Sequence, residues 1–122
     1  SNLHISYLGA KDTAFENGIY HARLVLKGYP NQAPVVAVMN PNGGYQPGVN
    51  LCIFGITHFH GEAFQKGMAL DMLIQALSSF MVEEAGGGHG IGMIVGQNAQ
   101  QIRQFAIQSQ SWSCPECGCN HA

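Results

Sequence analysis

The apolar residues of this chain change their spacing once along the sequence. Residues 3–7, 19–26 and 35–39 are short runs rich in β-branched and aromatic side chains, as strands are. Later in the chain, apolar side chains recur at helical spacing, at Leu70, Leu73, Ile74, Leu77, Phe80 and Met81. A second helical pattern covers residues 97–110. Strands followed by helices predict an α+β domain in which an antiparallel meander packs against the helices.

The connections between these runs contain clear turn signals. Asn17-Gly18 precedes the second strand-like run and is typical of a hairpin. Residues 40–67 form a connection that is too long for an ordinary loop, and such loops are usually functional. The 122 residues suffice for one small domain with one core.

Composition excludes several classes of function. Charged residues make up only 10% of the chain and the net charge is -2, which disfavours nucleic acid as a partner. No apolar run reaches the roughly 20 residues that a membrane-spanning helix needs. Three of the four cysteines lie in the last nine residues, which is no disulfide framework. A reducing, cytoplasmic location is therefore expected.

Cys52 stands apart from the other cysteines, inside the long connection. It can form no local disulfide or metal pair, so it is either an inert buried thiol or a nucleophile. Asn42 lies ten residues before it, in the sequence Asn-Pro-Asn-Gly at 40–43.

Four motifs occur in a fixed order around this cysteine. They are Asn-Gly-Ile-Tyr-His at 17–21, Asn-Pro-Asn-Gly at 40–43, Leu-Ser-Ser-Phe-Met-Val-Glu at 77–83 and Gln-Phe-Ala-Ile-Gln-Ser at 104–109. Together with the ten-residue spacing from Asn42 to Cys52, they resemble the catalytic (UBC) domain of ubiquitin-conjugating enzymes. The likeness is strongest to the endoplasmic-reticulum-associated, tail-anchored branch, and it covers residues 1–112.

The resemblance implies a UBC-like fold, with a four-stranded antiparallel meander, C-terminal helices and the family's opening helix missing. It implies an acyltransferase that carries ubiquitin as a thioester on Cys52 and transfers it to lysine, or to serine or threonine. Ubiquitin, an activating enzyme and a ligase are the implied partners, and no cofactor is. Membrane attachment through a tail absent here would place the full-length protein on the cytosolic face of the endoplasmic reticulum.

Three further residues are candidates for the chemistry. The amide of Asn42 could donate to an oxyanion, or it could fix the backbone of a turn. His58 and His60 lie in the same long connection as Cys52, where either could accept a proton or simply shape the loop.

The alternative function is a catalytically inactive UBC-like variant that acts as a binding module. Gly61, Phe64 and Gly67 replace the family's residues in the segment that faces ligases. Retention of both Cys52 and Asn42 favours an active enzyme.

Residues 113–122 form a separate tail rich in cysteine and histidine. Cys-x-x-Cys-Gly is a common half of a zinc knuckle, and Cys114, Cys117, Cys119 and His121 are the candidate ligands. Because the sequence shows no second ligand pair, the other interpretations are a flexible tail or a knuckle whose second half is missing.

Overall fold

A computed structural model describes residues 2–51, 53, 64–84 and 98–122. The elements are β1 (Asn2–Leu8), β2 (Ile19–Val25), β3 (Val35–Val38), α1 (Leu70–Glu84) and α2 (Ala99–Ser109). The strands form an antiparallel sheet in the order β1-β2-β3. The α+β class and the meander are therefore confirmed. The described part of the chain contains three strands, so the fourth strand and the missing opening helix stay predictions.

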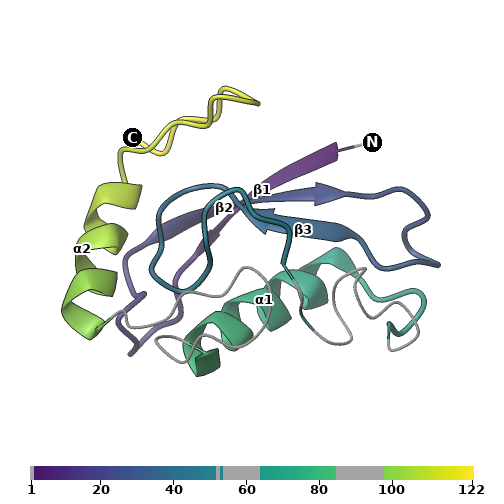
Figure 1. Ribbon diagram of the computed structural model, residues 1–122, viewed down its shortest axis with the longest axis horizontal. Coiled ribbons are helices and arrows are strands. Elements are labelled where there is room, and N and C mark those ends of the chain that lie inside the picture. The colour runs from purple at the N-terminus through teal and green to yellow at the C-terminus, as the bar shows by residue number, and fades with distance from the viewer. Residues whose placement is uncertain (1, 52, 54–63, 85–97) are drawn as a thin grey trace.

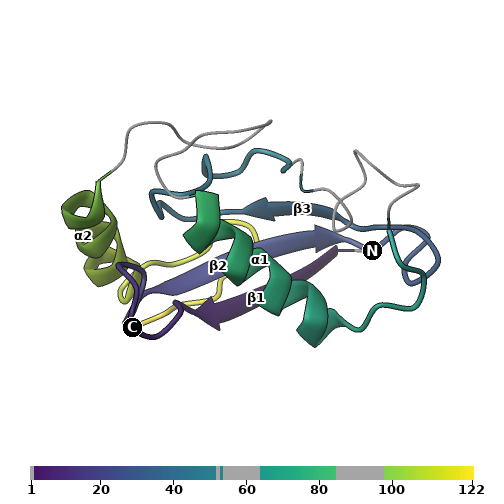
Figure 2. The same cartoon turned by 90° about the horizontal axis from the view of Figure 1, so that it is seen from below.

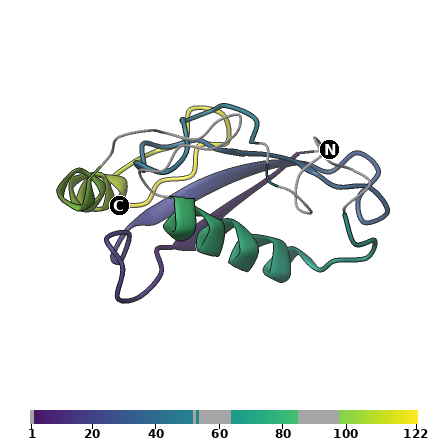
Figure 3. The ribbon, with the colours of Figure 1, turned by 60° about the horizontal axis from the view of Figure 1, so that its bottom comes forward.

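The two faces of the sheet are covered by different parts of the chain. Helix α1 crosses one face, and the C-terminal segment runs over the opposite face (Figures 1 and 2). Helix α2 stands beside one end of the sheet, as the tilted view also shows (Figure 3). The tail expected at residues 113–122 therefore lies against the domain.

The main core lies between α1 and the sheet. Strand side chains alternate between the two faces, and those directed at α1 pack with the predicted helical stripe. The buried members of this core are Tyr7, Phe15, Tyr20, Ala22, Leu24, Val36, Val38, Tyr45, Leu51, Ile53, Leu77, Met81 and Ile102. Within the stripe, Leu73, Leu77 and Met81 are buried, which confirms the inner face of the predicted helix.

The connection between β1 and β2 covers residues 9–18 and closes at Asn17-Gly18, where the sequence predicted a turn. The Gly9 N–H donates to the Gly18 carbonyl at 2.9 Å, and Asn17 adopts a positive φ of 71°. A Cβ at Gly9 would lie 1.8 Å from the carbonyl oxygen of Phe15, so only glycine fits there. This connection fixes the register in which β1 faces β2.

Helix α2 begins with a capping box in which Asn98 and Gln101 each bond the other's backbone N–H. At its other end, the Ser109 Oγ accepts a hydrogen bond of 2.8 Å from the N–H of Ile19, the first residue of β2. The last turn of the helix is therefore attached to the start of β2, the middle strand of the described sheet. Within the part of the chain that the structure covers, neither helix combines the length and apolarity needed to cross a bilayer.

Candidate active-site loop and histidine-cysteine cluster

The long connection begins by extending the sheet. The Met39 N–H donates to the His21 carbonyl at 2.7 Å. Asn40, which is fully buried, then pairs with β2 through its side chain: its Oδ1 accepts from the His21 N–H, and its Nδ2 donates to the Ile19 carbonyl. The Asn40 side chain thus makes hydrogen bonds to β2 that a further residue of β3 would otherwise make. The turn begins at this residue.

Asn42 is also fully buried, and its described contacts lie within the turn. Its Oδ1 accepts from the N–H groups of Gly44 and Tyr45, at 2.8 and 2.6 Å, and its Nδ2 donates to the Asn40 carbonyl at 2.9 Å. These bonds satisfy three buried backbone groups that water cannot reach. They support the turn-forming half of the predicted role, and donation to an oxyanion stays a prediction.

The turn is held between the two helices. Gly43 has a positive φ of 89°, and a Cβ there would lie 2.8 Å from Cγ1 of Ile102 on α2. On the other side, the Tyr45 hydroxyl donates to the carbonyl of Leu77 on α1 at 2.8 Å. The backbone that leads to the predicted nucleophile is therefore anchored to sheet and helices alike.

Cys52, His58 and His60 lie outside the described residues. The two chain neighbours of Cys52 are described, and both are buried in the main core: Leu51 is 0% and Ile53 3% exposed. The Leu51 N–H donates to the carbonyl of Val36 in β3 at 2.8 Å. This part of the predicted catalytic segment is thus attached to the edge of the sheet.

The C-terminal tail folds into a tight hairpin. The Cys114 N–H donates to the Cys119 carbonyl, and the Gly118 N–H donates back to the Cys114 carbonyl, at 2.8 and 2.9 Å. Gly118 has a positive φ of 78°, which glycine adopts without steric cost. The backbones of Ser113 and Asn120 pair antiparallel on either side. This hairpin is the backbone structure of the Cys-x-x-Cys-Gly segment, and zinc binding there stays a prediction.

The hairpin lies on a polar stripe of the sheet. In the strand register, His4 pairs with Arg23 and Ser6 pairs with His21, so all four are on the face opposite α1. Glu116 of the hairpin contacts this stripe with its carboxylate, 2.9 Å from a guanidinium nitrogen of Arg23. The tail and the first two strands are thereby brought together.

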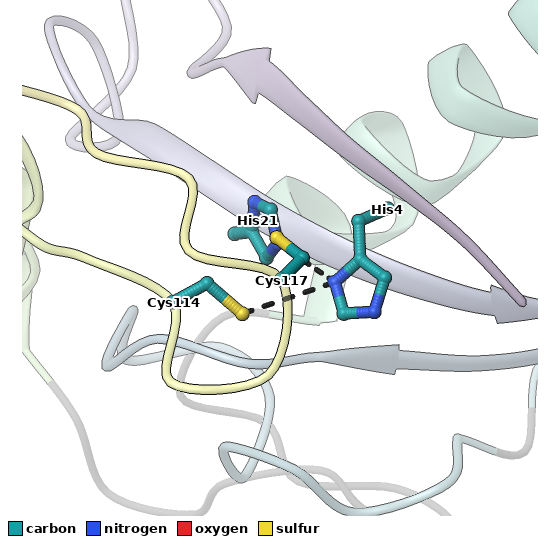
Figure 4. A group of neighbouring side chains, drawn as sticks. All are labelled: His4, His21, Cys114 and Cys117. Carbon is teal, nitrogen blue, oxygen red and sulfur yellow. Dashed lines mark hydrogen bonds between the residues drawn. The ribbon is translucent and has the colours of Figure 1, made fainter.

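Two groups of metal-binding side chains form where the hairpin meets the stripe. The ligand atoms of His4, His21, Cys114 and Cys117 all lie within 4.8 Å of one another (Figure 4). A second group joins His21 to Cys119 and His121 by the same measure. The four ligands predicted in the tail are therefore divided between two groups, and His21 belongs to both.

His4 and His21 are the residues that the sequence reasoning missed. The signal was available in two parts: each histidine stands at a polar position of a strand-like run, and a hairpin signal precedes the second run. The register of the two strands was needed to place them on one face.

The electrostatics of the cluster favour neutral imidazole at His21. Burial, together with the nearby His4 and His121, lowers the pKa of His21, while Glu116 acts in the opposite direction. The backbone N–H of Cys119 bonds the Cys117 sulfur and lowers the pKa of that thiol. Loss of hydration and the neighbouring Cys114 and Cys119 raise the pKa by more, so the pKa of Cys117 lies above its ordinary value.

Comparison with known proteins agrees with the motifs. No family model matches the chain. The human protein named ubiquitin-conjugating enzyme E2 J1 is 28% identical over 116 residues, 94% of this chain and 35% of that protein. Human ubiquitin-conjugating enzyme E2 J2 is 30% identical over 111 residues, 90% of this chain and 41% of that protein.

A plant protein gives the same result. Ubiquitin-conjugating enzyme E2 32 of Arabidopsis thaliana is 34% identical over 103 residues, 84% of this chain and 32% of that protein. The chain thus spans about a third to two fifths of the length of these relatives, whose names denote a class of transferases. The similarity covers nearly the whole chain, so the chain contains a UBC domain related to those of ubiquitin-conjugating enzymes E2 J1 and E2 J2.

Proposed function

We propose that the protein is a ubiquitin-conjugating enzyme that carries ubiquitin as a thioester on Cys52. The observation that supports this most is the similarity to named ubiquitin-conjugating enzymes over 84 to 94% of the chain. The thiolate of Cys52 would attack the ubiquitin thioester held by an activating enzyme, whose own thiol leaves. Exchange between two thioesters is close to isoenergetic, so thiolate and access matter more than a strong base.

Discharge follows when an acceptor amine, that of a lysine, attacks the thioester carbonyl. The C–N bond forms, the C–S bond breaks, Cys52 leaves as a thiolate and the attacking amine loses a proton. A serine or threonine hydroxyl would react in the same way to give an ester. The same proposal includes a ubiquitin ligase as a partner, a protein substrate that supplies the acceptor, and attachment of the full-length protein to the endoplasmic reticulum membrane.

A charging assay tests the proposal. Incubation with ubiquitin-activating enzyme, ATP and ubiquitin is expected to produce an adduct of one ubiquitin that a thiol reductant removes. A folded protein that forms no such adduct at any concentration of activating enzyme would instead support the inactive binding module.

Asn42 is expected to act in both folding and discharge. Asn42→Ala removes the side-chain oxygen that accepts from the Gly44 and Tyr45 N–H groups, which costs about 2 kcal/mol of unfolding free energy. Asn42→Asp keeps that acceptor but sets its second carboxyl oxygen, in place of the Nδ2 donor, against the Asn40 carbonyl, so only part of the stability is expected to return. Since the aspartate lacks the amide donor, its single-turnover discharge to lysine is expected to be slower by on the order of 100-fold. A folded Asp variant that discharges as fast as the parent would leave Asn42 with the turn alone.

His58 is proposed to accept a proton from the attacking group, with His60 shaping the same loop. An unperturbed histidine changes charge near pH 6.5, so the rate of discharge is expected to fall as the pH is lowered through about that value. Single-turnover discharge to lysine and to a hydroxyl acceptor, for the parent and His58→Gln, checks this. Superimposable pH profiles of the two proteins would remove His58 from the mechanism.

A further inference from the structure

We propose that the protein binds one structural zinc ion between the sheet and the C-terminal hairpin, through His4 and His21 of β1 and β2 and Cys114 and Cys117 of the tail. The proposal does not depend on Cys52 or on ubiquitin transfer. It replaces Cys119 and His121, the other two ligands expected from the sequence, with two histidines from the sheet.

Three of the six distances between the ligand atoms are close to those of a tetrahedral site, and all six are within 4.8 Å. Zinc with Zn–S of 2.3 Å and Zn–N of 2.0–2.1 Å separates sulfur from nitrogen by about 3.6 Å and two nitrogens by about 3.3 Å. The Sγ of Cys114 lies 3.8 Å from His4 Nδ1, and the Sγ of Cys117 lies 3.4 Å from His21 Nε2. His4 Nδ1 and His21 Nε2 are 2.9 Å apart. Adjustments of a few tenths of an ångström would complete the site.

The hydrogen bonds around Ser6 fix the tautomer of His21. His121 Nδ1 lies 2.9 Å from the Ser109 carbonyl, which only accepts, so a neutral His121 carries its proton on Nδ1. Its Nε2 is then an acceptor, and the Ser6 hydroxyl, 2.8 Å away, must donate to it. Because the hydroxyl proton of Ser6 is already donated to His121, Ser6 Oγ can only accept a hydrogen bond from the N–H at His21 Nδ1, 2.9 Å away. The lone pair of His21 is therefore on Nε2, the atom that faces His4 and Cys117.

The same hydrogen bonds show which of the two groups of side chains has nitrogens available to a metal ion. The Nε2 of His121 is occupied by the Ser6 hydroxyl and its Nδ1 by the Ser109 carbonyl, so neither nitrogen is available to a metal. Cys119 lies 3.9 Å from Ser6 and joins that network. Cys119 and His121 thus support the site by holding Ser6 and His21 in place.

His4 is supported in a similar way. Its Nε2 is 3.8 Å from a carboxylate oxygen of Glu116, whose other oxygen binds Arg23. A carboxylate that faces the outer nitrogen favours a proton there and leaves the lone pair on Nδ1, which is the usual arrangement of metal-binding histidines. The nitrogens with the lone pairs, His4 Nδ1 and His21 Nε2, both lie within 4.8 Å of the two sulfurs (Figure 4).

Such an ion would join the beginning of the chain to its end. Its ligands come from the first two strands and from the last nine residues, so it would hold the tail against the sheet face opposite α1. Neither described core cluster includes a residue of the hairpin. Metal binding would then contribute directly to the stability of this face.

Metal analysis of the purified, reduced protein tests the proposal. One equivalent of bound zinc is expected, and Co²⁺ in its place is expected to give the intense visible bands of a four-coordinate thiolate site. Removal of the ion by a chelator is expected to lower the Tm by on the order of 10 °C. Wild-type protein that takes up no stoichiometric zinc from a buffer containing it would overturn the proposal.

Matched variants identify the ligands. Cys117 is exposed and His4 half-buried, so Cys117→Ser and His4→Gln are expected to fold yet lose the bound zinc. Cys119→Ser and His121→Gln are expected to keep it, and Ser6→Ala to bind it about 10-fold to 100-fold more weakly. Loss of zinc in His121→Gln together with its retention in His4→Gln would overturn this ligand set in favour of the tail cluster.

Discussion

Replacement of Cys52 by alanine is expected to abolish the reductant-sensitive ubiquitin adduct completely. Alanine offers no atom that can form an acyl bond, and the other three cysteines lie in the hairpin on the opposite side of the sheet from α1. Cys52→Ser is expected to trap ubiquitin as an oxyester, which a thiol reductant does not cleave. Gel analysis of the charging reaction with and without reductant measures both results.

Cys119→Ser is the matched control for this experiment. It removes a thiol from the tail and leaves Cys52 and the four proposed zinc ligands unchanged. Charging is therefore expected to equal that of the parent. An adduct on the Cys52→Ala protein that reductant still removes would show that another cysteine accepts ubiquitin.

Truncation of Leu77 to alanine is expected to cost about 3 kcal/mol of unfolding free energy. Leu77 is 1% exposed and packs in the main core between α1 and the sheet. Removal of its branched end leaves a cavity that the surrounding aromatic side chains can fill only in part. Equilibrium unfolding in urea measures the loss.

Ile107 on α2 provides the matched control, because it is 67% exposed although equally apolar. Ile107→Ala is expected to change the unfolding free energy by less than about 0.5 kcal/mol. Similar losses in the two variants would mean that α1 is not packed as the structure has it.

Much of the fold follows from local signals in the sequence. Runs of β-branched and aromatic residues placed the three described strands to within one or two residues, and helical spacing placed α2 and α1, the latter with its buried face. These signals are reliable because side chains that alternate or recur every 3.6 residues have only one way to face a core. The fourth strand is not among the described residues, so that part of the prediction is untested.

The role of Asn42 shows where local reasoning stops. The sequence identified a turn residue or a catalytic amide and could not separate them. The structure adds that the amide is buried and bonded to three backbone groups of its own turn. Burial depends on how the turn packs between α1 and α2, and no spacing within the loop contains that information.

The sequence by itself determined the order of strands and helices, the relationship to ubiquitin-conjugating enzymes and the half-site Cys114-x-x-Cys117-Gly. Only the tertiary structure decided which side chains lie beside those two cysteines. His4 and His21 are 17 positions apart and about 100 residues from the cysteines, and they meet because the hairpin register sets them on one face of the sheet. A metal site needs a few atoms at fixed distances in space, whereas a sequence pattern fixes distances only along the chain.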